Sequence, residues 1–494
     1  MRVVVVGAGL GGLSAAAHLV GAGHDVTVLE RGTRPGGRAG LVDNALGYTL
    51  DNGPTVFTMP ELLEEAFTAV GRKMADHITL EAVDPMYRAC YEDGSELHVW
   101  HERERMVEEI RALAGPHDAA GFERFCTWLD ELYRVEMSSF IDRNIDSVTD
   151  LIRPLAPALR LVRMGGFGKL ERKVGSFFRD ERVRRIFTFQ SMYAGLAPYE
   201  ALALYAVITY MDCVRGVFAP KGGMHQCAAG LADAVDSAGA TFQYGADVRR
   251  ILLASGTRGP VRGVELADGE RIRADAVVCN ADLPVAYRTL TPGLDAPRAA
   301  RRGRYSPSCL LWVAGVRGGP PTGAAHHNIH FGRDWNSAFR AIMHDGERMP
   351  DPSILVTMHS VDDASLAPTG CSTMYALEPM PNLDGRIDWT VRGRELADSL
   401  RARVAGLGYP VDVEVEAVID PLDWERAGME RGTPFALAHT FRQTGPFRPS
   451  NVDERAPGLV FTGSSTLPGV GVPMVLISGK LAAQRVQQFA GRRP

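Results

Sequence analysis

The chain has 494 residues, more than one compact core usually holds, so we expect two lobes or more. Its hydrophobic content of 45% and charged content of 23% are those of an ordinary folded protein, and a net charge of -5 gives no general attraction to nucleic acid. None of its seven cysteines forms a C-x-x-C pair, which argues against a disulfide framework or a zinc site and fits a reducing cytoplasm.

From the sequence we expect neither a secretory leader nor a membrane-spanning segment. It opens almost directly on an apolar strand pattern, with no basic region and cleavage site before it. No apolar run approaches the roughly 18 residues of a spanning helix. We therefore expect a protein that is soluble or lies on a membrane face.

The opening segment predicts a dinucleotide-binding unit. Residues 3–6 are four valines, typical of a parallel strand buried on both faces. The glycines Gly7, Gly9 and Gly12 of a G-x-G-x-x-G pattern follow, then a helix, a second strand over 26–30 and the acid Glu30 at its end. The glycines permit a tight turn, close approach of a pyrophosphate and close packing of helix on strand, while the carboxylate binds ribose hydroxyls.

The next segments favour FAD over NAD. Residues 31–40 form a glycine-rich loop in which Arg38 can reach the pyrophosphate as a cation, whereas NAD dehydrogenases normally continue here into another helix. Residues 48–55 predict a strand that runs into a glycine-proline turn, which brings bare backbone close to a flat ring. At the other end, the loop at 463–473 is rich in Gly and Pro and leads into a helix predicted over 474–487. The N-terminus of that helix can stabilise negative charge on a reduced flavin.

Together these motifs resemble those of the flavin-containing amine oxidase and carotenoid desaturase superfamily. G-A-G-L-G-G, Glu30 and P-G-G-R match the superfamily, and F-T-G-S-S-T-L-P-G-V-G-V-P-M-V-L-I-S-G at 461–479 closely resembles the C-terminal motif of bacterial-type phytoene desaturases. Two departures are Leu467, where that family often has His, and Ser464, where it more often has Ala.

The resemblance implies an α/β fold: a Rossmann-like FAD-binding domain of the GR2 type with an inserted α+β substrate domain. The FAD-binding domain is expected from residues 1–75, 226–290 and 455–494, and the substrate domain from 76–225 and 291–454. The residues expected to contact FAD are Gly7, Gly9, Gly12, Glu30, Arg31, Gly37, Arg38, Gly53, Pro54, Thr55, Val248, Asn280, Gly463, Ser464, Gly471, Val472, Pro473 and Met474. No histidine spacing predicts a metal site.

Residues 151–190 are unusually basic for this chain. They hold ten basic and three acidic residues, interleaved with large apolar side chains. One interpretation is a surface that docks on anionic lipid, and the other is a solvated helical face over a core stripe. The hydrocarbon substrate implied by the resemblance favours the membrane, so we expect a cytoplasmic protein attached peripherally to the bilayer.

Desaturation of a hydrocarbon requires a hydride acceptor and a group that stabilises charge or takes a proton. Asp150 and Arg153 are spaced so that they can share a helix face as an ion pair, and the resemblance implies that such a D-x-x-R pair lies near the flavin. The structural alternative is an ordinary surface ion pair.

The expected function is that of an FAD-dependent carotenoid desaturase acting on phytoene to give lycopene or a partly desaturated product. With no second nucleotide motif in the sequence, oxygen or a membrane quinone is the expected electron acceptor. The alternatives are another carotenoid desaturase or isomerase, an FAD amine oxidase, and a non-catalytic prenyl-binding protein like the Rab GDP-dissociation inhibitors. The last class has no need of the glycine triad together with Glu30 and Arg38.

Overall fold

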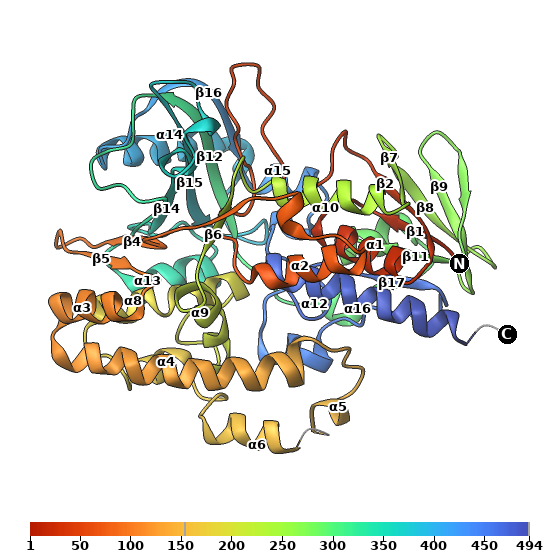
Figure 1. Cartoon of the computed structure of the whole chain (residues 1–494), viewed down its shortest axis with the longest axis horizontal. Helices are drawn as coiled ribbons and strands as arrows, with labels where there is room; N and C mark the ends of the chain where they lie inside the picture. Colours follow the sequence, from red (N-terminus) through yellow and green to blue (C-terminus); the bar gives the residue numbers. More distant parts are fainter. Residues whose placement is uncertain (153–154, 493–494) are drawn as a thin grey trace.

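The computed structural model describes residues 1–152 and 155–492. A five-stranded parallel sheet in the order β17-β11-β1-β2-β7 forms the centre of the first lobe (Figure 1). Its strands are β1 (Arg2–Val6), β2 (Asp25–Glu30), β7 (Thr241–Tyr244), β11 (Ala276–Cys279) and β17 (Leu459–Phe461). The valine run of β1 is buried on both faces, as expected for a central parallel strand.

Helices cover one face of this sheet and a second, smaller sheet covers the other. The helices are α1 (Leu10–Gly21), α2 (Pro60–Ala69), α10 (Gln226–Ser237) and α16 (Val472–Ala490), which share one apolar core with the sheet. The small antiparallel sheet consists of β8 (Val248–Leu253), β9 (Val261–Leu266) and β10 (Arg271–Arg273). α1 and α16 pack against each other, so the two ends of the chain meet in this lobe.

A seven-stranded sheet in the order β16-β12-β15-β14-β13-β4-β5 forms the centre of the second lobe. Only β13 and β4 pair in parallel. The strands are β4 (Tyr87–Cys90), β5 (Glu96–Val99), β12 (Ser308–Arg317), β13 (His327–His330), β14 (Ile354–Thr357), β15 (Cys371–Met380) and β16 (Asp412–Ile419). α14 (Trp389–Gly406) packs on β12 and β15, and a two-stranded ribbon, β3 (Leu80–Ala82) and β6 (Phe218–Pro220), completes the sheets.

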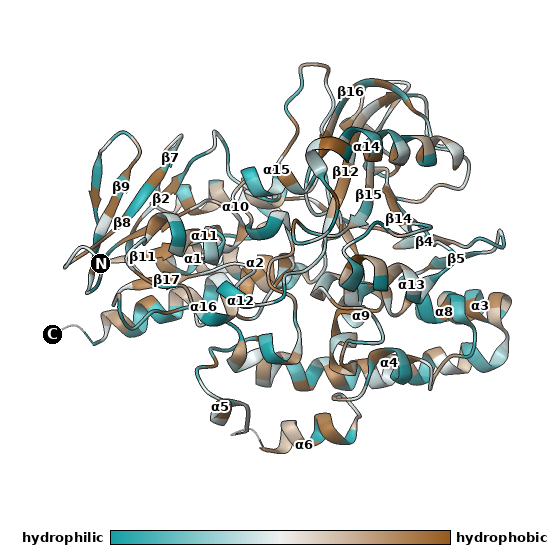
Figure 2. Cartoon of the chain, turned by 180° about the vertical axis from the view of Figure 1, so that it is seen from behind, coloured by the Kyte–Doolittle hydropathy of each residue, from teal (hydrophilic) through white to brown (hydrophobic). Residues whose placement is uncertain are grey.

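A helical layer lies beside that sheet, and α5 and α6 lie at its outer edge below α4 in both views (Figures 1 and 2). Its helices are α3 (Arg103–Ala114), α4 (Pro116–Glu136), α5 (Val148–Ile152), α6 (Leu155–Arg163), α7 (Leu170–Val174), α8 (Glu181–Ile186) and α9 (Ala206–Cys213). Short turns of helix join them, including the π-helix η2 (Met137–Ile141) and the 3-10 helices η3 (Phe189–Ala194) and η4 (Ala203–Tyr205). No helix in residues 1–152 and 155–492 is both long and apolar enough to cross a bilayer.

The remaining helical elements are short and lie in connections. They are η1 (Met74–Asp76), α11 (Leu283–Val285), η5 (Ala286–Leu290), α12 (Arg298–Arg302), α13 (Trp335–Arg340), η6 (Ala341–Asp345), η7 (His359–Val361), η8 (Ala364–Leu366), α15 (Pro421–Arg426), η9 (Glu430–Gly432), η10 (Phe441–Gln443) and η11 (Gly445–Phe447).

This architecture is the α/β fold expected from the sequence, whereas the strand predicted before the glycine-proline turn is wrong. Residues 48–55 contain only an isolated bridge between Asp51 and Leu41. Side chains fix this segment instead: the Asp51 carboxylate accepts hydrogen bonds from the backbone N–H groups of Met224 and His225 at 2.8 and 3.0 Å. The five strands of the parallel sheet come from 2–30, 241–279 and 459–461, while the exact domain limits stay a prediction.

Candidate functional site

One large cavity runs between the two lobes. Its volume is about 1820 Å³, well above the 300–1,000 Å³ usual for a small-molecule site. Backbone-rich loops of the first lobe line one part, which we call the glycine strip, defined by residues 7–11, 30–41, 52–55, 280–282 and 462–474. Apolar side chains of the second lobe line the other part, which we call the chamber. A cavity of this form suits two neighbouring ligands. One is elongated and polar and lies along the glycine strip, and the other is a hydrocarbon that fills the chamber.

The turn between β1 and α1 begins the glycine strip. Gly7 has a φ of 95°, which favours glycine, and Gly9 precedes a helix whose first turn has no side-chain cap. The N–H groups of that turn are therefore available to an anion. Gly12 lies behind this surface: a Cβ placed there would be 2.1 Å from the carbonyl oxygen of Gly7. Glycine at position 12 thus allows helix and strand to pack closely.

Glu30 is held in position at the end of β2. Its Oε2 accepts the backbone N–H of Ala8 and its Oε1 accepts that of Gly32, both at 2.8 Å. Each carboxylate oxygen keeps a second lone pair. Since Glu30 lines the cavity, those lone pairs can accept hydrogen bonds from ribose hydroxyls.

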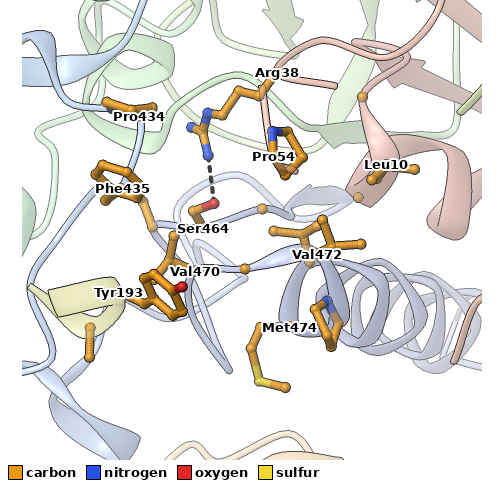
Figure 3. A pocket seen from close by; sticks show the side chains of 18 of the residues that line it. Leu10, Arg38, Pro54, Tyr193, Pro434, Phe435, Ser464, Val470, Val472 and Met474 are labelled. Carbon is orange, nitrogen blue, oxygen red and sulfur yellow. Dashed lines mark hydrogen bonds between the residues drawn. The ribbon is translucent and has the colours of Figure 1, made fainter. Parts of the chain in front are cut away.

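Arg38 connects the two ends of the chain within the glycine strip. Its Nη1 donates a hydrogen bond to Oγ of Ser464 at 2.6 Å, close to Pro54 and Val472 (Figure 3). Burial lowers the pKa of the Arg38 guanidinium, while the nearby Asp282 acts in the opposite direction. A cation held at low hydration between two loops is suited to bind a pyrophosphate.

The C-terminal motif supplies the opposite wall. Gly471 has a φ of 110° and precedes α16, whose first turn, like that of α1, has no side-chain cap. Gly469 packs against the ring of His439, because a Cβ at that position would be 2.1 Å from Cε1 of His439. An imidazole therefore lies beside this loop although position 467 is leucine. Burial and the neighbouring Arg448 hold the pKa of His439 well below its usual value, so the ring is neutral.

The glycine-proline turn completes the strip. The hydroxyl of Tyr375 donates a hydrogen bond to the carbonyl oxygen of Gly53 at 2.9 Å. Nε2 of His327 lies 3.1 Å from the carbonyl oxygen of Thr55. A Cβ on Gly53 would be 1.8 Å from the carbonyl oxygen of Arg38, so only glycine allows the two loops to touch. The second lobe thereby fixes the turn against the first.

Large apolar side chains line the chamber. Among the described residues, only two carboxyl groups line it, and both are buried. Aromatic and aliphatic residues from η2, α6, η3, α9 and the seven-stranded sheet line it, among them Phe140, Leu161, Phe189, Tyr193, Val207, Met211, Phe331 and Leu355. The carboxyl groups belong to Glu136 and Asp212, which are 5% and 2% exposed. Burial raises the pKa of Glu136 well above its usual value and that of Asp212 to about 7.

The cavity brings together nearly all residues predicted to contact a cofactor. Seventeen of the eighteen line it, and Gly12 supports the turn from behind. Whether each contacts the cofactor stays a prediction. Asp150 is not among the lining residues; its Oδ2 accepts hydrogen bonds from Ser147, at 3.0 Å from N and 3.1 Å from Oγ. Arg153 lies outside the described residues, so the predicted pair remains a prediction.

Sequence reasoning missed Asp212, Glu136 and His439. Asp212 lies in the last turn of α9 and Glu136 ends α4, where a carboxyl group looks like an ordinary helix-terminal residue. Their burial in a chamber became visible only when separate segments came together. For His439, the glycine at position 469 was an available but indirect signal, because a residue without a side chain lets a ring pack closely.

The geometry of the strip fits FAD. Two uncapped helix N-termini, the oriented Glu30 and the Arg38 guanidinium match the phosphates and ribose of a dinucleotide. The bare backbone at Gly53 and Gly471 gives a flat ring system room to approach.

Comparisons with known proteins agree with this assignment. The chain is 47% identical to a phytoene dehydrogenase of Streptomyces griseus, over 98% of this chain and 95% of that protein. It is 39% identical to a zeta-carotene-forming phytoene desaturase of Myxococcus xanthus, over 99% and 94%. A redesigned putrescine oxidase variant has the same fold, with a TM-score of 0.60 and 17% identity, over 100% of this chain and 99% of that one. Residues 10–487 match the family described as flavin containing amine oxidoreductase. The chain belongs to the flavin-containing amine oxidoreductase family, and its cofactor is FAD.

Proposed function

We propose that this protein is a carotenoid desaturase that acts on phytoene and forms lycopene or a partly desaturated product. The observation that carries the proposal is the single cavity in which the glycine strip opens directly into the apolar chamber. A hydrocarbon offers no hydrogen-bonding groups, so only shape and apolar contact can orient it. The full-length similarity to a phytoene dehydrogenase supports the same substrate class.

FAD supplies the hydride acceptor for such a reaction. The residues of this chain would bind the cofactor and orient the substrate. The strip would hold the dinucleotide through Glu30, Arg38 and the two helix N-termini, and the chamber would exclude water and place a section of polyene beside the ring. Met474, which lines the cavity at the start of α16, packs against the apolar core of the chamber lobe and so joins the two parts.

The entrance of the chamber carries exposed apolar side chains, which we call the apolar rim. They come from α5, α6, the turn after α6 and the loop around η10 and η11. All of them line the cavity: Val148, Leu155, Leu159, Val162, Phe167, Phe441 and Phe447. Their exposed fractions run from 44% to 61%. Clustered exposure of this kind marks an interaction surface.

The occupant we propose for the apolar rim is a lipid bilayer, with the protein attached peripherally on the cytoplasmic side. The helices α5 and α6, which carry most of the rim residues, lie at the edge of the molecule (Figure 2). Arg163, Lys169 and Arg172 are exposed next to it and can attract anionic lipid. A substrate dissolved in lipid would then enter the chamber without crossing water. Oxygen or a membrane quinone is the proposed electron acceptor.

Asp150 and Arg153 remain the catalytic pair proposed from the family resemblance. Asp150 is next in sequence to rim residues, since Val148 belongs to the same short helix. Loss of desaturation in both Asp150→Asn and Arg153→Ala would support the pair, and full activity in both would remove it.

Two rival functions find less support. Amine oxidases are related here at 17% identity, which indicates a shared fold alone. A prenyl-binding protein without catalysis would not need the oriented Glu30 and the Arg38 that faces the cavity.

Co-expression with a phytoene-producing pathway, followed by pigment chromatography, tests the proposal. We expect phytoene to be consumed and coloured, desaturated carotenoids to accumulate. Unchanged phytoene, with the flavin-loaded protein present in the cells, would contradict it.

A further inference from the structure

Asp212 is a buried carboxyl group of which only one oxygen has a hydrogen-bond partner among the described residues. It is 2% exposed, it lines the chamber, and the described residues contain no ion pair to it. The hydroxyl of Tyr87 donates a hydrogen bond to Oδ1, while Oδ2 has no hydrogen-bond partner among the described residues. A buried acceptor left unpaired costs about 1–3 kcal/mol, so this position is unfavourable unless the open oxygen has a task.

The environment of Asp212 keeps both of its protonation states accessible. Burial raises the pKa of the carboxyl group to about 7, while the hydrogen bond from Tyr87 and the nearby Gln190 amide act in the opposite direction. The other titratable groups facing it are Tyr193 and Cys213, and burial raises the pKa of each well above its usual value. All of these neighbours are neutral at physiological pH, so Asp212 is the group that changes charge there.

Asp212 also lies at the end of the chamber that adjoins the glycine strip. Tyr193 of the chamber, whose ionisation Asp212 and Tyr375 both oppose, lies beside Phe435 and beside Val470 of the glycine strip (Figure 3). Tyr375 in turn bonds to Gly53 of the glycine-proline turn. From the other side, the Tyr87 ring lies 5.4 Å from that of His327, which contacts Thr55.

We propose that Asp212 accepts the proton that the substrate loses during desaturation, and that Tyr87 positions it. This inference rests on the proposed function. FAD would supply the acceptor for the hydrogen that leaves one carbon with its electron pair. The neighbouring carbon gives its proton to Oδ2 of Asp212, and the electron pair of that C–H bond becomes the second bond of the new C=C. Reoxidation passes both electrons and both protons to the acceptor, oxygen or quinone.

Glu136 does not compete for this role although it is also buried in the chamber. Burial alone raises its pKa well above the usual value, which favours the protonated carboxyl group over a carboxylate that could take a proton. It also lies next to Tyr205, whose hydroxyl bonds to the carbonyl oxygen of His439.

The chain contains a matched control. On the same helix α9, the hydroxyl of Tyr210 donates to Oδ1 of Asp130 at 2.8 Å, the same kind of tyrosine–aspartate bond. Neither residue lines the cavity. Asp130→Asn and Tyr210→Phe therefore reproduce the chemical change of Asp212→Asn and Tyr87→Phe away from the substrate.

The test measures anaerobic flavin reduction in flavin-loaded protein mixed with phytoene-containing liposomes, as a function of pH. Wild type should react faster as pH rises, with one ionisation near neutrality. Asp212→Asn should be slower by about 10²–10⁴-fold and lose that ionisation, while Asp212→Glu restores part of the rate. Tyr87→Phe should move the ionisation to higher pH, because a hydrogen bond that favours the carboxylate is lost. Both controls should keep the wild-type profile.

The outcomes separate the two proposals. If wild type with bound flavin is not reduced by phytoene, the proposed function fails. If wild type is reduced and Asp212→Asn keeps its rate and pH profile, the role of Asp212 is overturned. If Asp212→Asn does not fold, Tyr87→Phe decides: an unshifted profile overturns the inference and an upward shift supports it.

Discussion

Replacing Gly12 by alanine tests whether close packing of α1 on β1 creates the dinucleotide site. The new Cβ would be 2.1 Å from the carbonyl oxygen of Gly7 and 3.2–3.3 Å from the Asn280 side chain. Because the nearest atom belongs to backbone, no side-chain rotation relieves the contact, and the start of α1 must move by roughly 1 Å. Overpacking of this kind costs about 1–3 kcal/mol of stability.

The same displacement moves the N–H groups of the first helical turn away from the pyrophosphate. We expect Gly12→Ala to be purified with little FAD and to bind added FAD at least about 10-fold more weakly, which corresponds to roughly 1.4 kcal/mol. Flavin absorbance and thermal unfolding with and without FAD measure both effects. Gly406→Ala is the control, since Gly406 ends α14 and its new methyl group would have nothing within 4 Å beyond its own helix and chain neighbours. Normal FAD affinity and unchanged stability in Gly12→Ala would refute the reasoning.

Three further substitutions test the strip and the rim. Arg38→Ala should weaken FAD binding by about 10–100-fold in a fluorescence titration, since a charge-assisted hydrogen bond contributes about 1.5–3 kcal/mol; unchanged affinity would remove Arg38 from the site. Glu30→Gln leaves one of two backbone N–H groups without an acceptor. It should therefore lower the thermal midpoint of the apoprotein and weaken FAD binding. If neither the midpoint nor the affinity changes, Glu30 is dispensable. Leu159→Glu should reduce co-flotation with anionic liposomes, while Val391→Glu, at an exposed valine of α14 outside the cavity lining, should not; equal flotation of both would contradict bilayer docking.

The glycine strip was predictable because each of its parts has a local signature. The turn after β1 requires glycine at fixed spacing, and Glu30 ends a strand whose valine-rich pattern defines its position. The second wall, at 463–474, is predictable from its glycines and prolines and from the helix that follows. That these walls meet follows from the packing of α1 on α16, for which the sequence alone offered only the family resemblance.

The chamber was not predictable in the same way. Asp212 and Tyr87 are 125 positions apart, on a helix and a strand whose packing no short pattern encodes. The apolar rim combines α6 with the loop at 441–447, which carries no periodic signal. The wrong prediction of a strand at 48–55 has a similar cause. Asp51 in this segment is held by the backbone N–H groups of Met224 and His225, which are distant in the sequence.

The basic segment at 151–190 contains residues that fit each of its two interpretations. Leu161 and Leu170 are buried and belong to the chamber core, as the core-stripe interpretation expects. Leu155, Leu159 and Val162 are exposed at the cavity entrance, as the membrane interpretation expects. The segment thus has a buried face and an exposed apolar face, and the bilayer proposal rests on the second.

The most direct test of the central claim is an anaerobic titration of the purified, flavin-loaded protein with phytoene in liposomes. We expect flavin absorbance to bleach as one new double bond forms per flavin, with the product extracted and identified by chromatography. Absorbance that persists with phytoene and with its partly desaturated products, but bleaches with an amine such as putrescine, would contradict it.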